Sequence, residues 1–422
     1  MRDIKEKVRQ QLASGDYFFG RKEKAPVNHE RLRKEVQKAI ENVVALERIS
    51  LSDEEKNKIA NELMDEVVGF GPLTPLLNDP SVTEIMVNGQ DYVYMEKDGE
   101  MILTDIKFEN QRHLAQTIEK IMAPTQRRVD ESSPFVDASL PDGSRVNIIL
   151  PPLSLLGPVI TIRKFLREIA TMEDLLKRDT LTQHMSDFLI AAVKAKLNII
   201  FAGATGVGKT TTLNVISSYI SGHERIITIE DTSELRLKQR HVVPLETRPP
   251  NVEGKGEIPI KELFKNSLRM RPDRIILGEI RGGEALEMLQ AISSGHAGSL
   301  AVLHASSPED VISRIETMII TSNSAIPLWA IRRQIANAID LIVMQEQLCD
   351  GKRKITHISE VVGMENDEVA LRDLFSYEIT GISENDQSVM GRWKTGGVVP
   401  DFYSRFKLRG INLPSEIFQA TE

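Results

Sequence analysis

Residues 198–213 constrain the fold more than any other stretch of the chain. Four residues occupy the fixed places of the pattern G-x-x-x-x-G-K-[ST]: Gly203, Gly208, Lys209 and Thr210. The apolar run that ends at the first glycine predicts a buried strand. Apolar residues after the loop recur at helical spacing, at Leu213, Ile216 and Ile220. A strand, a glycine-rich loop and a helix in this order are the context that gives the pattern its meaning.

The residue types of this loop suit a phosphate group. Glycines let the backbone turn tightly and aim successive N–H groups inward, and the start of the helix adds its positive end. Lys209 supplies a cation for the outer phosphates of a nucleotide, and the Thr210 hydroxyl is a natural Mg²⁺ ligand. The alternative is an ordinary glycine-rich turn with a surface lysine, which the flanking strand and helix argue against. The candidate nucleotide-binding residues are Gly203, Ala204, Thr205, Gly206, Val207, Gly208, Lys209, Thr210 and Thr211.

Composition excludes several classes of protein. The length of 422 residues predicts two or three domains. A net charge of −8 disfavours a dedicated nucleic-acid binder, and the single cysteine, Cys349, suits a reducing compartment such as the cytoplasm. The N-terminus resembles no signal peptide. The most apolar run, 148–162, contains three prolines and is too short to span a bilayer, so membrane association would come through a partner or the surface.

Hydrophobic periodicity divides the chain into five parts. Residues 1–65 predict charged helices, 66–165 an α+β domain, and 166–179 a linker. Strands and helices alternate over 180–345, which predicts an α/β domain with a parallel sheet covered by helices. Residues 346–422 predict a strand pair and a polar tail that ends in a short docked helix.

The expected elements follow from these patterns. In the α+β domain we expect strands at 82–88, 92–96, 101–103, 135–140, 145–150 and 159–163, and a helix at 111–122. In the α/β domain we expect strands at 198–202, 225–229, 274–277, 299–303 and 341–345. Its helices are expected at about 183–195, 208–221, 260–269, 283–294, 307–320 and 327–338. The strand pair covers 355–362 and 369–377, the polar tail begins at Ile379, and the docked helix lies within 400–414.

Carboxylates follow two of the expected parallel strands. Glu230 and Asp231 end one strand, and Glu279 comes just after another. Ligands of open α/β sheets bind at that edge, where an NTPase needs a carboxylate to organise Mg²⁺ or polarise the attacking water. The alternative is that these acids cap the helices that follow. Gly278 stands where an aspartate is common, so we do not expect that strand to ligate the metal directly.

Two histidines flank the strand at 299–303. His296 precedes it and His304 ends it. The pair could ligate a metal, but no third ligand is nearby in the sequence. A structural histidine is the ordinary alternative. We favour His304 as a polar contact to the nucleotide or to a neighbouring subunit.

Four sequence boxes resemble those of the type II/type IV secretion ATPase superfamily, in the same order. Residues 203–211 are similar to its Walker A motif, 229–231 to its Asp-box, 277–281 to its Walker B motif and 295–305 to its His-box. The segments 127–134, 141–147, 247–251 and 268–274 resemble the tight-adherence (Tad or Flp) pilus branch. The resemblance covers about residues 65–345.

The resemblance implies a ring of six copies, each with an N-terminal domain joined to a RecA-like ATPase domain. It implies that ATP hydrolysis with Mg²⁺ drives pilus assembly or secretion at the cytoplasmic face of the inner membrane. The implied partners are a pilus platform protein of that membrane and, indirectly, pilin. Rotation between the domains would need a hinge, which we expect at 166–172.

The resemblance also implies roles for single residues. It assigns catalysis to Glu279, Glu230 and His304, and nucleotide contacts to Asp231, Arg281 and His296. It further implies that Arg145 and Arg163 point at the phosphates as arginine fingers do. Neither arginine has an obvious acidic partner nearby in the sequence.

Two other functions stay open. A RecA-like nucleic-acid motor would need a basic groove with interleaved aromatic side chains, whereas only 5% of the residues are aromatic and the net charge is negative. A nucleotide-gated scaffold would bind ATP with little turnover, and the presence of Glu279 argues against it. Stimulation of hydrolysis by DNA would separate the first alternative from a secretion motor, and a turnover assay would separate the second.

Overall fold

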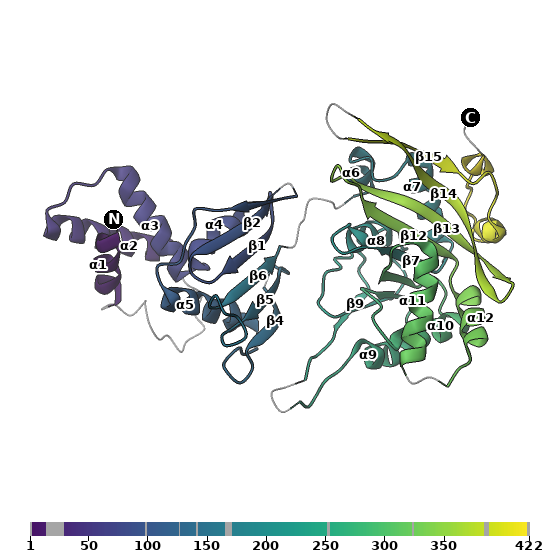
Figure 1. Cartoon of the computed structure of the whole chain (residues 1–422), viewed down its shortest axis with the longest axis horizontal. Helices are drawn as coiled ribbons and strands as arrows, with labels where there is room; N and C mark the ends of the chain where they lie inside the picture. Colours follow the sequence, from purple (N-terminus) through teal and green to yellow (C-terminus); the bar gives the residue numbers. More distant parts are fainter. Residues whose placement is uncertain are drawn as a thin grey trace. The chain divides into compact units, whose positions relative to one another are not determined.

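The computed structural model describes residues 2–13, 29–97, 99–125, 127–140, 142–164, 171–250, 254–322, 325–383 and 388–419. The chain forms two compact units, unit 1 at residues 1–166 and unit 2 at residues 167–422 (Figure 1). Five residues of the expected hinge, 166–170, lie outside the described residues. None of the helices in the described segments has both the length and the apolar character that a membrane crossing requires.

Unit 1 begins with three helices that surround an apolar cluster of their own. They are α1 (Arg2–Ala13), α2 (His29–Glu47) and α3 (Asp53–Val67). Ser52 caps α3 in a capping box with Glu55, which satisfies two backbone N–H groups at the helix start. Val8, Val36 and Leu63 are fully buried where the helices meet. The charged helices predicted for residues 1–65 are therefore present.

A network of partly buried ion pairs connects these helices to the rest of unit 1. Arg9 on α1 donates to Glu66 on α3 (Nη2 to Oε1, 2.7 Å) and to Glu109 (Nη1 to Oε2, 2.7 Å). The hydrogen bonds from Arg9 hold the pKa of Glu109 at about 2, far below its ordinary value. Lys5 reinforces the network through Glu66 at 2.7 Å. Because each charge has an opposite partner, the network fixes α1 rather than leaving an unpaired charge at a half-buried position.

A six-stranded antiparallel sheet forms the second part of unit 1. Its strands are β1 (Val82–Asn88), β2 (Tyr92–Lys97), β3 (Glu100–Leu103), β4 (Phe135–Ser139), β5 (Arg145–Ile149) and β6 (Val159–Arg163), in the order β3-β2-β1-β6-β5-β4. All six predicted strands are present. The helix α5 (Gln111–Met122) buries Leu114, Ile118 and Ile121 in the same apolar cluster as the sheet, and α4 (Thr74–Asn78) precedes β1.

Unit 2 contains one nine-stranded sheet. Its strands are β7 (Ile199–Gly203), β8 (Ile226–Glu230), β9 (Val242–Glu246), β10 (Arg274–Leu277), β11 (Leu300–His304), β12 (Leu341–Gln347), β13 (Arg353–Glu365), β14 (Glu368–Ile382) and β15 (Val389–Thr395). Their order is β15-β14-β13-β12-β7-β11-β10-β8-β9. The run from β12 to β9 is parallel, as predicted. The three remaining strands extend it in antiparallel fashion, and β13 and β14 form the long yellow-green hairpin of Figure 1.

Helices cover both faces of this sheet, so the central strands are apolar on both sides. They are α6 (Met172–Lys177), α7 (Gln183–Lys194), α8 (Lys209–Ser217), α9 (Ile260–Ser267), α10 (Glu284–Ser293), α11 (Pro308–Thr321), α12 (Leu328–Ala338) and α13 (Ser404–Leu408). Ile199 and Phe201 of β7 share an apolar cluster with residues of α7 and α8. Ile200 and Ala202 share the other cluster with residues of α9 to α12. The chain therefore has the predicted α/β architecture.

Three expectations for unit 2 are corrected. The strand β9 was not expected, and α6 lies within the expected linker 166–179. The polar tail expected from Ile379 is instead the end of β14 followed by β15, so residues 346–395 continue the sheet of the preceding strands. Pro244 in β9 removes a backbone donor, which an edge strand tolerates.

The docked helix expected within 400–414 is present as α13. Phe406 is 1% exposed and meets Phe188 of α7 edge to face, with ring centroids 6.3 Å apart. The neighbouring Leu408 on the same helix is 85% exposed. The C-terminal segment therefore closes the apolar cluster on the α7 and α8 face through one buried side of a short helix.

Phe406→Ala should lower the free energy of unfolding of unit 2 by about 3–5 kcal/mol, the usual cost of removing a buried aromatic side chain. Leu408→Ala, the matched control on the same helix, should change it by less than about 0.5 kcal/mol. Urea unfolding followed by tryptophan fluorescence measures unit 2 alone, because both tryptophans, Trp329 and Trp393, belong to it. Equal midpoints for the two variants would show that α13 is not docked as described.

Candidate functional site

The glycine-rich loop joins the end of β7 at Gly203 to the start of α8 at Lys209. The predicted order of strand, loop and helix is therefore confirmed. Gly206 and Gly208 have φ angles of 80° and 97°, which L-residues with side chains rarely adopt. Gly208 is the residue before the helix, so its left-handed backbone turns the chain from the loop into α8. The first N–H groups of α8 are then available to an anion.

Lys209 is buried at the start of α8. Its Nζ donates to the carbonyl oxygen of Ala204, 2.5 Å away, and lies 3.4 Å from Nδ1 of His304. His304 reaches this position because it lies opposite Gly203 in the ladder between β11 and β7. The lysine that is expected to bind phosphate and the histidine at the end of the next strand therefore meet across the loop.

Glu230, at the end of β8, is 2% exposed. Its Oε1 accepts the backbone N–H groups of Glu234 and Leu235, at 2.9 and 3.0 Å. Its Oε2 is buried without a hydrogen-bond partner among the described residues. Burial raises the pKa of this carboxyl to about 7, against the two backbone hydrogen bonds that lower it. Glu230 thus orders the turn after β8, although residues 231–241 contain no helix for it to cap, and it still presents a free oxygen that titrates near neutrality.

The glycine at position 278 has a steric reason. A β-carbon added at Gly278 would lie 2.6 Å from Cγ of Glu230, closer than such atoms approach. The strand β10, which ends at Leu277, is paired with β8, so the two strand ends face each other. An aspartate at 278 would displace Glu230. This chain therefore has the buried glutamate on β8 in place of a carboxylate on residue 278.

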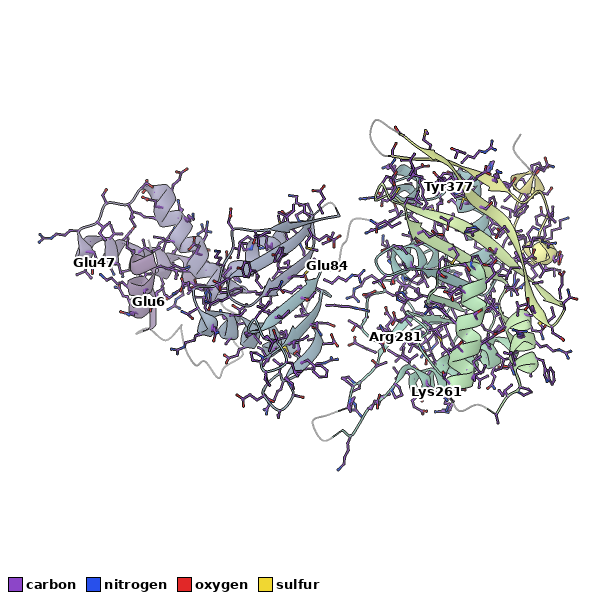
Figure 2. The ribbon with its side chains drawn as sticks, in the orientation of Figure 1. Glu6, Glu47, Glu84, Lys261, Arg281 and Tyr377 are labelled. Atoms are coloured by element: carbon purple, nitrogen blue, oxygen red, sulfur yellow. The ribbon has the colours of Figure 1, made fainter. Side chains whose placement is uncertain are left out.

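Glu279 belongs to a chain of charged contacts. Its Oε1 pairs with Nε of Arg281, and its Oε2 lies 3.6 Å from Nε2 of His304. Arg281, which Figure 2 labels, also pairs with Asp231, with Nη1 and Oδ2 2.9 Å apart. Glu284 fixes the intervening turn by accepting the N–H groups of Arg281 and Gly282. His304 therefore connects Lys209 to Glu279, and Arg281 connects Glu279 to Asp231.

His296 does not lie at this edge of the sheet, contrary to the nucleotide contact expected for it. It precedes β11, and β11 runs parallel to β7, so it lies at the amino edge while the glycine-rich loop lies at the carboxyl edge. Both its backbone nitrogen and its Nδ1 face the carbonyl oxygen of Ala291, at 3.1 and 3.2 Å. Within this chain His296 ends the helix α10, which is a structural role.

Arg145 and Arg163 both belong to unit 1. They lie directly opposite each other on β5 and β6, and therefore on one face of the sheet. Glu84 on β1, which Figure 2 labels, lies opposite Arg163, with Oε1 3.7 Å from its Nε. Arg163 thus has an acidic partner that is distant from it in the sequence. Like charges placed directly opposite each other destabilise a sheet. Arg145 and Arg163 place two guanidinium groups on one face of the sheet of unit 1, with the Glu84 carboxylate beside one of them.

Comparison with known proteins places the chain in a family. A family model described as type II/IV secretion system protein matches residues 66–398. The chain belongs to the type II/IV secretion system protein family.

Individual members of the family are similar over most of their length. The type IV secretion system protein PtlH of Bordetella pertussis is 35% identical over 311 residues, which are 65% of this chain and 88% of the relative. The conjugal transfer protein TrbB of Rhizobium radiobacter is 28% identical over 288 residues, 67% of this chain and 85% of the relative. Among solved structures, the VirB11 ATPase of Brucella suis is 29% identical with a TM-score of 0.38, covering 68% of this chain and 95% of its own.

Proteins that hydrolyse nucleotides generally bind them together with Mg²⁺. The residues at the glycine-rich loop of this family member are suited to that ion. The described residues contain no group of three or more acidic, histidine or cysteine side chains that could hold a metal by itself. Mg²⁺ at nucleotide sites needs only one or two protein ligands, because phosphates and waters complete its shell. Thr210, in the first turn of α8, supplies a hydroxyl next to Lys209. The chain thus offers the ligand that a nucleotide-bound Mg²⁺ requires.

Two polar residues near the loop of this family member were missed by sequence reasoning. Gln345 on β12 accepts the Thr212 hydroxyl at 2.8 Å, and Arg353 on β13 lies beside Gly208. The sequence holds one signal for Gln345, which directly follows the apolar run 341–344. It holds no such signal for Arg353. The polar residues at and just after the ends of β8 and β10 belong to recognisable motifs, whereas the end of β12 carries no motif.

The raised pKa of Glu230 predicts a pH-dependent stability. Between its ordinary value of 4.5 and about 7 the native state binds the proton more tightly than the unfolded chain, so stability is lost as pH rises through this window. The loss is on the order of 3 kcal/mol at most. Glu230→Gln should remove this pH dependence, because the amide does not titrate. The free energy of unfolding of the wild type, relative to that of the variant, should therefore fall between pH 5 and pH 8.

The measurement is urea unfolding by tryptophan fluorescence at both pH values. Glu257→Gln, which changes an exposed carboxylate of the same unit, is the control and should follow the wild type. If the wild type and Glu230→Gln lost the same stability between pH 5 and pH 8, Glu230 would be ionised throughout and the raised pKa would be wrong.

Proposed function

We propose that the protein is an ATPase motor that powers assembly of a type IV pilus of the tight-adherence kind, or related secretion, at the cytoplasmic face of the inner membrane. One observation carries the proposal: Lys209, His304 and Glu279 form a continuous chain of contacts from the glycine-rich loop to a candidate base. Family membership supports it, as does a relative named as a type IV secretion system protein.

Each residue of the site has a chemical role in this proposal. The N–H groups of the loop and Lys209 bind the phosphates, as a preorganised cradle that needs no rearrangement when charge shifts. The Thr210 hydroxyl would hold Mg²⁺, which would neutralise part of the phosphate charge. Glu279 accepts a proton from the attacking water, and His304, between Glu279 and Lys209, contacts the terminal phosphate. Glu230 is the second candidate base because its Oε2 is buried and free of partners in the described segments.

Arg281 and Asp231 control the candidate base. Arg281 pairs with Glu279 and with Asp231, so it fixes the direction of the Glu279 carboxylate. A carboxylate bound to a guanidinium is also a weaker base, so Arg281 must shift toward Asp231 before Glu279 can take a proton efficiently. In the proposed cycle Asp231 is the acceptor that makes this shift possible.

The proposed assembly is a ring of six copies that acts with a platform protein of the inner membrane and, through it, on pilin. Its support is the resemblance to the tight-adherence branch, together with the family membership. No nucleic acid is proposed as a partner, because the net charge of −8 and the few aromatic residues are unsuited to a single strand. Residues 166–172 are proposed as the hinge of the motor.

Two substitutions test the proposed function. Glu279→Gln should leave ATP binding nearly intact and lower the rate of hydrolysis about 10²–10⁴-fold, because the positioned base is lost. Lys209→Ala should weaken ATP binding itself, because the phosphates lose their buried cation. Steady-state hydrolysis and equilibrium ATP binding on the full chain measure the two effects.

The outcomes separate the competing functions. Turnover of Glu279→Gln at the wild-type rate would transfer the role of base to Glu230. Wild-type protein that binds ATP without turnover, even with its platform protein, would indicate the nucleotide-gated scaffold. Hydrolysis that DNA stimulates would indicate the nucleic-acid motor.

Arg145 and Arg163 are proposed as further cations that act on the phosphates. Arg145→Ala and Arg163→Ala should each lower hydrolysis, by up to about 10³–10⁵-fold for an arginine finger. Lysine at either position should rescue poorly, because it keeps the charge and loses the planar fork. Arg112, an exposed arginine on α5 of the same unit, supplies the control variant Arg112→Ala, which should hydrolyse ATP normally. Full activity in both arginine variants would reduce them to surface residues of the sheet.

A further inference from the structure

The residues assigned so far lie on one side of the glycine-rich loop. Lys209 and the loop follow β7, while His304, Glu279 and Glu230 come from or follow β11, β10 and β8, which lie in that order on one side of β7. The strands β12 and β13 lie on the other side. Neither strand has a role in the site described above, yet both contribute a polar side chain that touches the loop.

Gln345, near the end of β12, supports both ends of the loop. It is buried, and its Oε1 accepts the hydroxyl of Thr212 on α8 at 2.8 Å. A β-carbon added at Gly208 would lie 3.1 Å from its Nε2, and one added at Gly203 would lie 2.1 Å from its backbone oxygen. The two fixed glycines of the motif therefore both lie against this one residue, and the position of Gly203 has no room for a side chain.

Arg353, at the start of β13, lies beside the same glycine. A β-carbon at Gly208 would lie 3.8 Å from Cδ of Arg353, the atom that carries the guanidinium group. Arg353 lies opposite Gln347, two residues from the pair of Gln345 and Ile355. Ile355 packs in the apolar cluster that includes Leu213 of α8, so Arg353 is on the sheet face that α8 covers.

We propose that Arg353 is a nucleotide-binding residue that contacts the diphosphate shared by ATP and ADP, and that Gln345 is the residue that positions the loop beside it. The inference rests on the proposed function, because it requires a nucleotide in the loop. The reacting phosphate faces Glu279 and His304, so the opposite side of the loop faces the part of the nucleotide that does not react. An arginine there fits, because its planar fork of donors matches phosphate oxygens and stays charged at any working pH.

The position of Arg353 predicts how it affects the kinetics. A contact with the diphosphate is the same in the bound substrate and in the transition state, so it strengthens binding without speeding the chemical step. Loss of the contact should raise KM and leave kcat nearly unchanged. Glu279, by contrast, acts only in the chemical step. The split between KM and kcat therefore distinguishes the two sides of the loop.

The first experiment compares Arg353→Ala and Arg353→Lys with Lys352→Ala, the control that removes the adjacent exposed cation. Binding of ADP and of ATP to the full chain is measured by titration calorimetry, and kcat and KM by steady-state hydrolysis. Arg353→Ala should weaken both nucleotides by the same factor, roughly 10- to 100-fold, as expected for a hydrogen bond to a charged group. Arg353→Lys should retain part of the affinity, and Lys352→Ala all of it.

Three results would overturn the role of Arg353. They are unchanged ADP affinity in Arg353→Ala, a loss for ATP but not for ADP, and a change in the ratio of ATP to GTP affinity, which would place the side chain on the base. Lys209→Ala and Glu279→Gln are measured in parallel. If these two behave as expected and Arg353→Ala does not, only the present inference fails. If the wild type neither binds nor hydrolyses ATP, the proposed function fails first.

The second experiment tests the positioning role of Gln345 by a double-mutant cycle with Thr212. Gln345→Met and Thr212→Val each remove one partner of their hydrogen bond, and the double variant removes both. If Gln345 acts on the loop through Thr212, the losses in ADP affinity should be clearly less than additive. Additive losses would overturn this role. Urea midpoints from tryptophan fluorescence show whether each variant is folded. A further variant, Gln345→Glu, keeps the hydrogen-bond acceptor but adds a negative charge, which should repel the diphosphate and weaken ADP binding.

Discussion

The strands β7 and β11 finish level with one another and β12 continues past them to Gln347, and the candidate site depends on this register. His304 pairs with Gly203 across one ladder, and Met344 pairs with Ala202 across the other. The ends of β11 and β12 therefore stand on either side of the loop, with His304 against Lys209 and Gln345 beneath the two glycines. A slip of one residue in either ladder would turn these side chains to the opposite face of the sheet. The apolar clusters on both faces prevent that slip, because alternate residues of β7 belong to different clusters.

Much of the fold could be predicted from hydrophobic patterns, and the missed elements have physical reasons. The central strands are buried on both faces and read as continuous apolar runs, such as the run before Gly203. The strands β9 and β15 lie at the two edges of the sheet, where half-exposed positions carry proline, glycine and charged residues. Edge strands commonly carry such residues because they prevent pairing with other chains. Their patterns therefore look like loops, although the ladder of a neighbouring strand holds them.

The candidate site could be predicted where its residues lie in or next to a motif. Lys209, Glu230 and Glu279 follow strands that are evident in the sequence. His296 lies at the opposite edge of the sheet within this chain, a placement that the resemblance of residues 295–305 to a His-box did not indicate. A five-residue strand rises about 3.3 Å per residue, so it separates the two histidines by roughly 16 Å. Gln345 and Arg353 were missed because a strand from the far end of the unit returns beside β7, and only the strand order of the folded sheet shows it.

The polar contacts of the site form one continuous chain of side chains, in which Lys209, His304 and Arg281 each have two competing partners. Lys209 is shared between the oxygen of Ala204 and His304, His304 lies between Lys209 and Glu279, and Arg281 is shared between Glu279 and Asp231. A phosphate in the loop competes for Lys209, because a doubly charged anion attracts an ammonium more strongly than a carbonyl does. The loss of a partner matters most at Lys209, which is buried, since an unpaired buried polar group costs roughly 1–3 kcal/mol. Thr247, whose hydroxyl lies 3.3 Å from Oδ1 of Asp231, connects the last member to the loop that follows β9. The arrangement therefore links the occupancy of the glycine-rich loop to contacts at the far end of the same sheet edge, by exchange of partners rather than by movement of the strands.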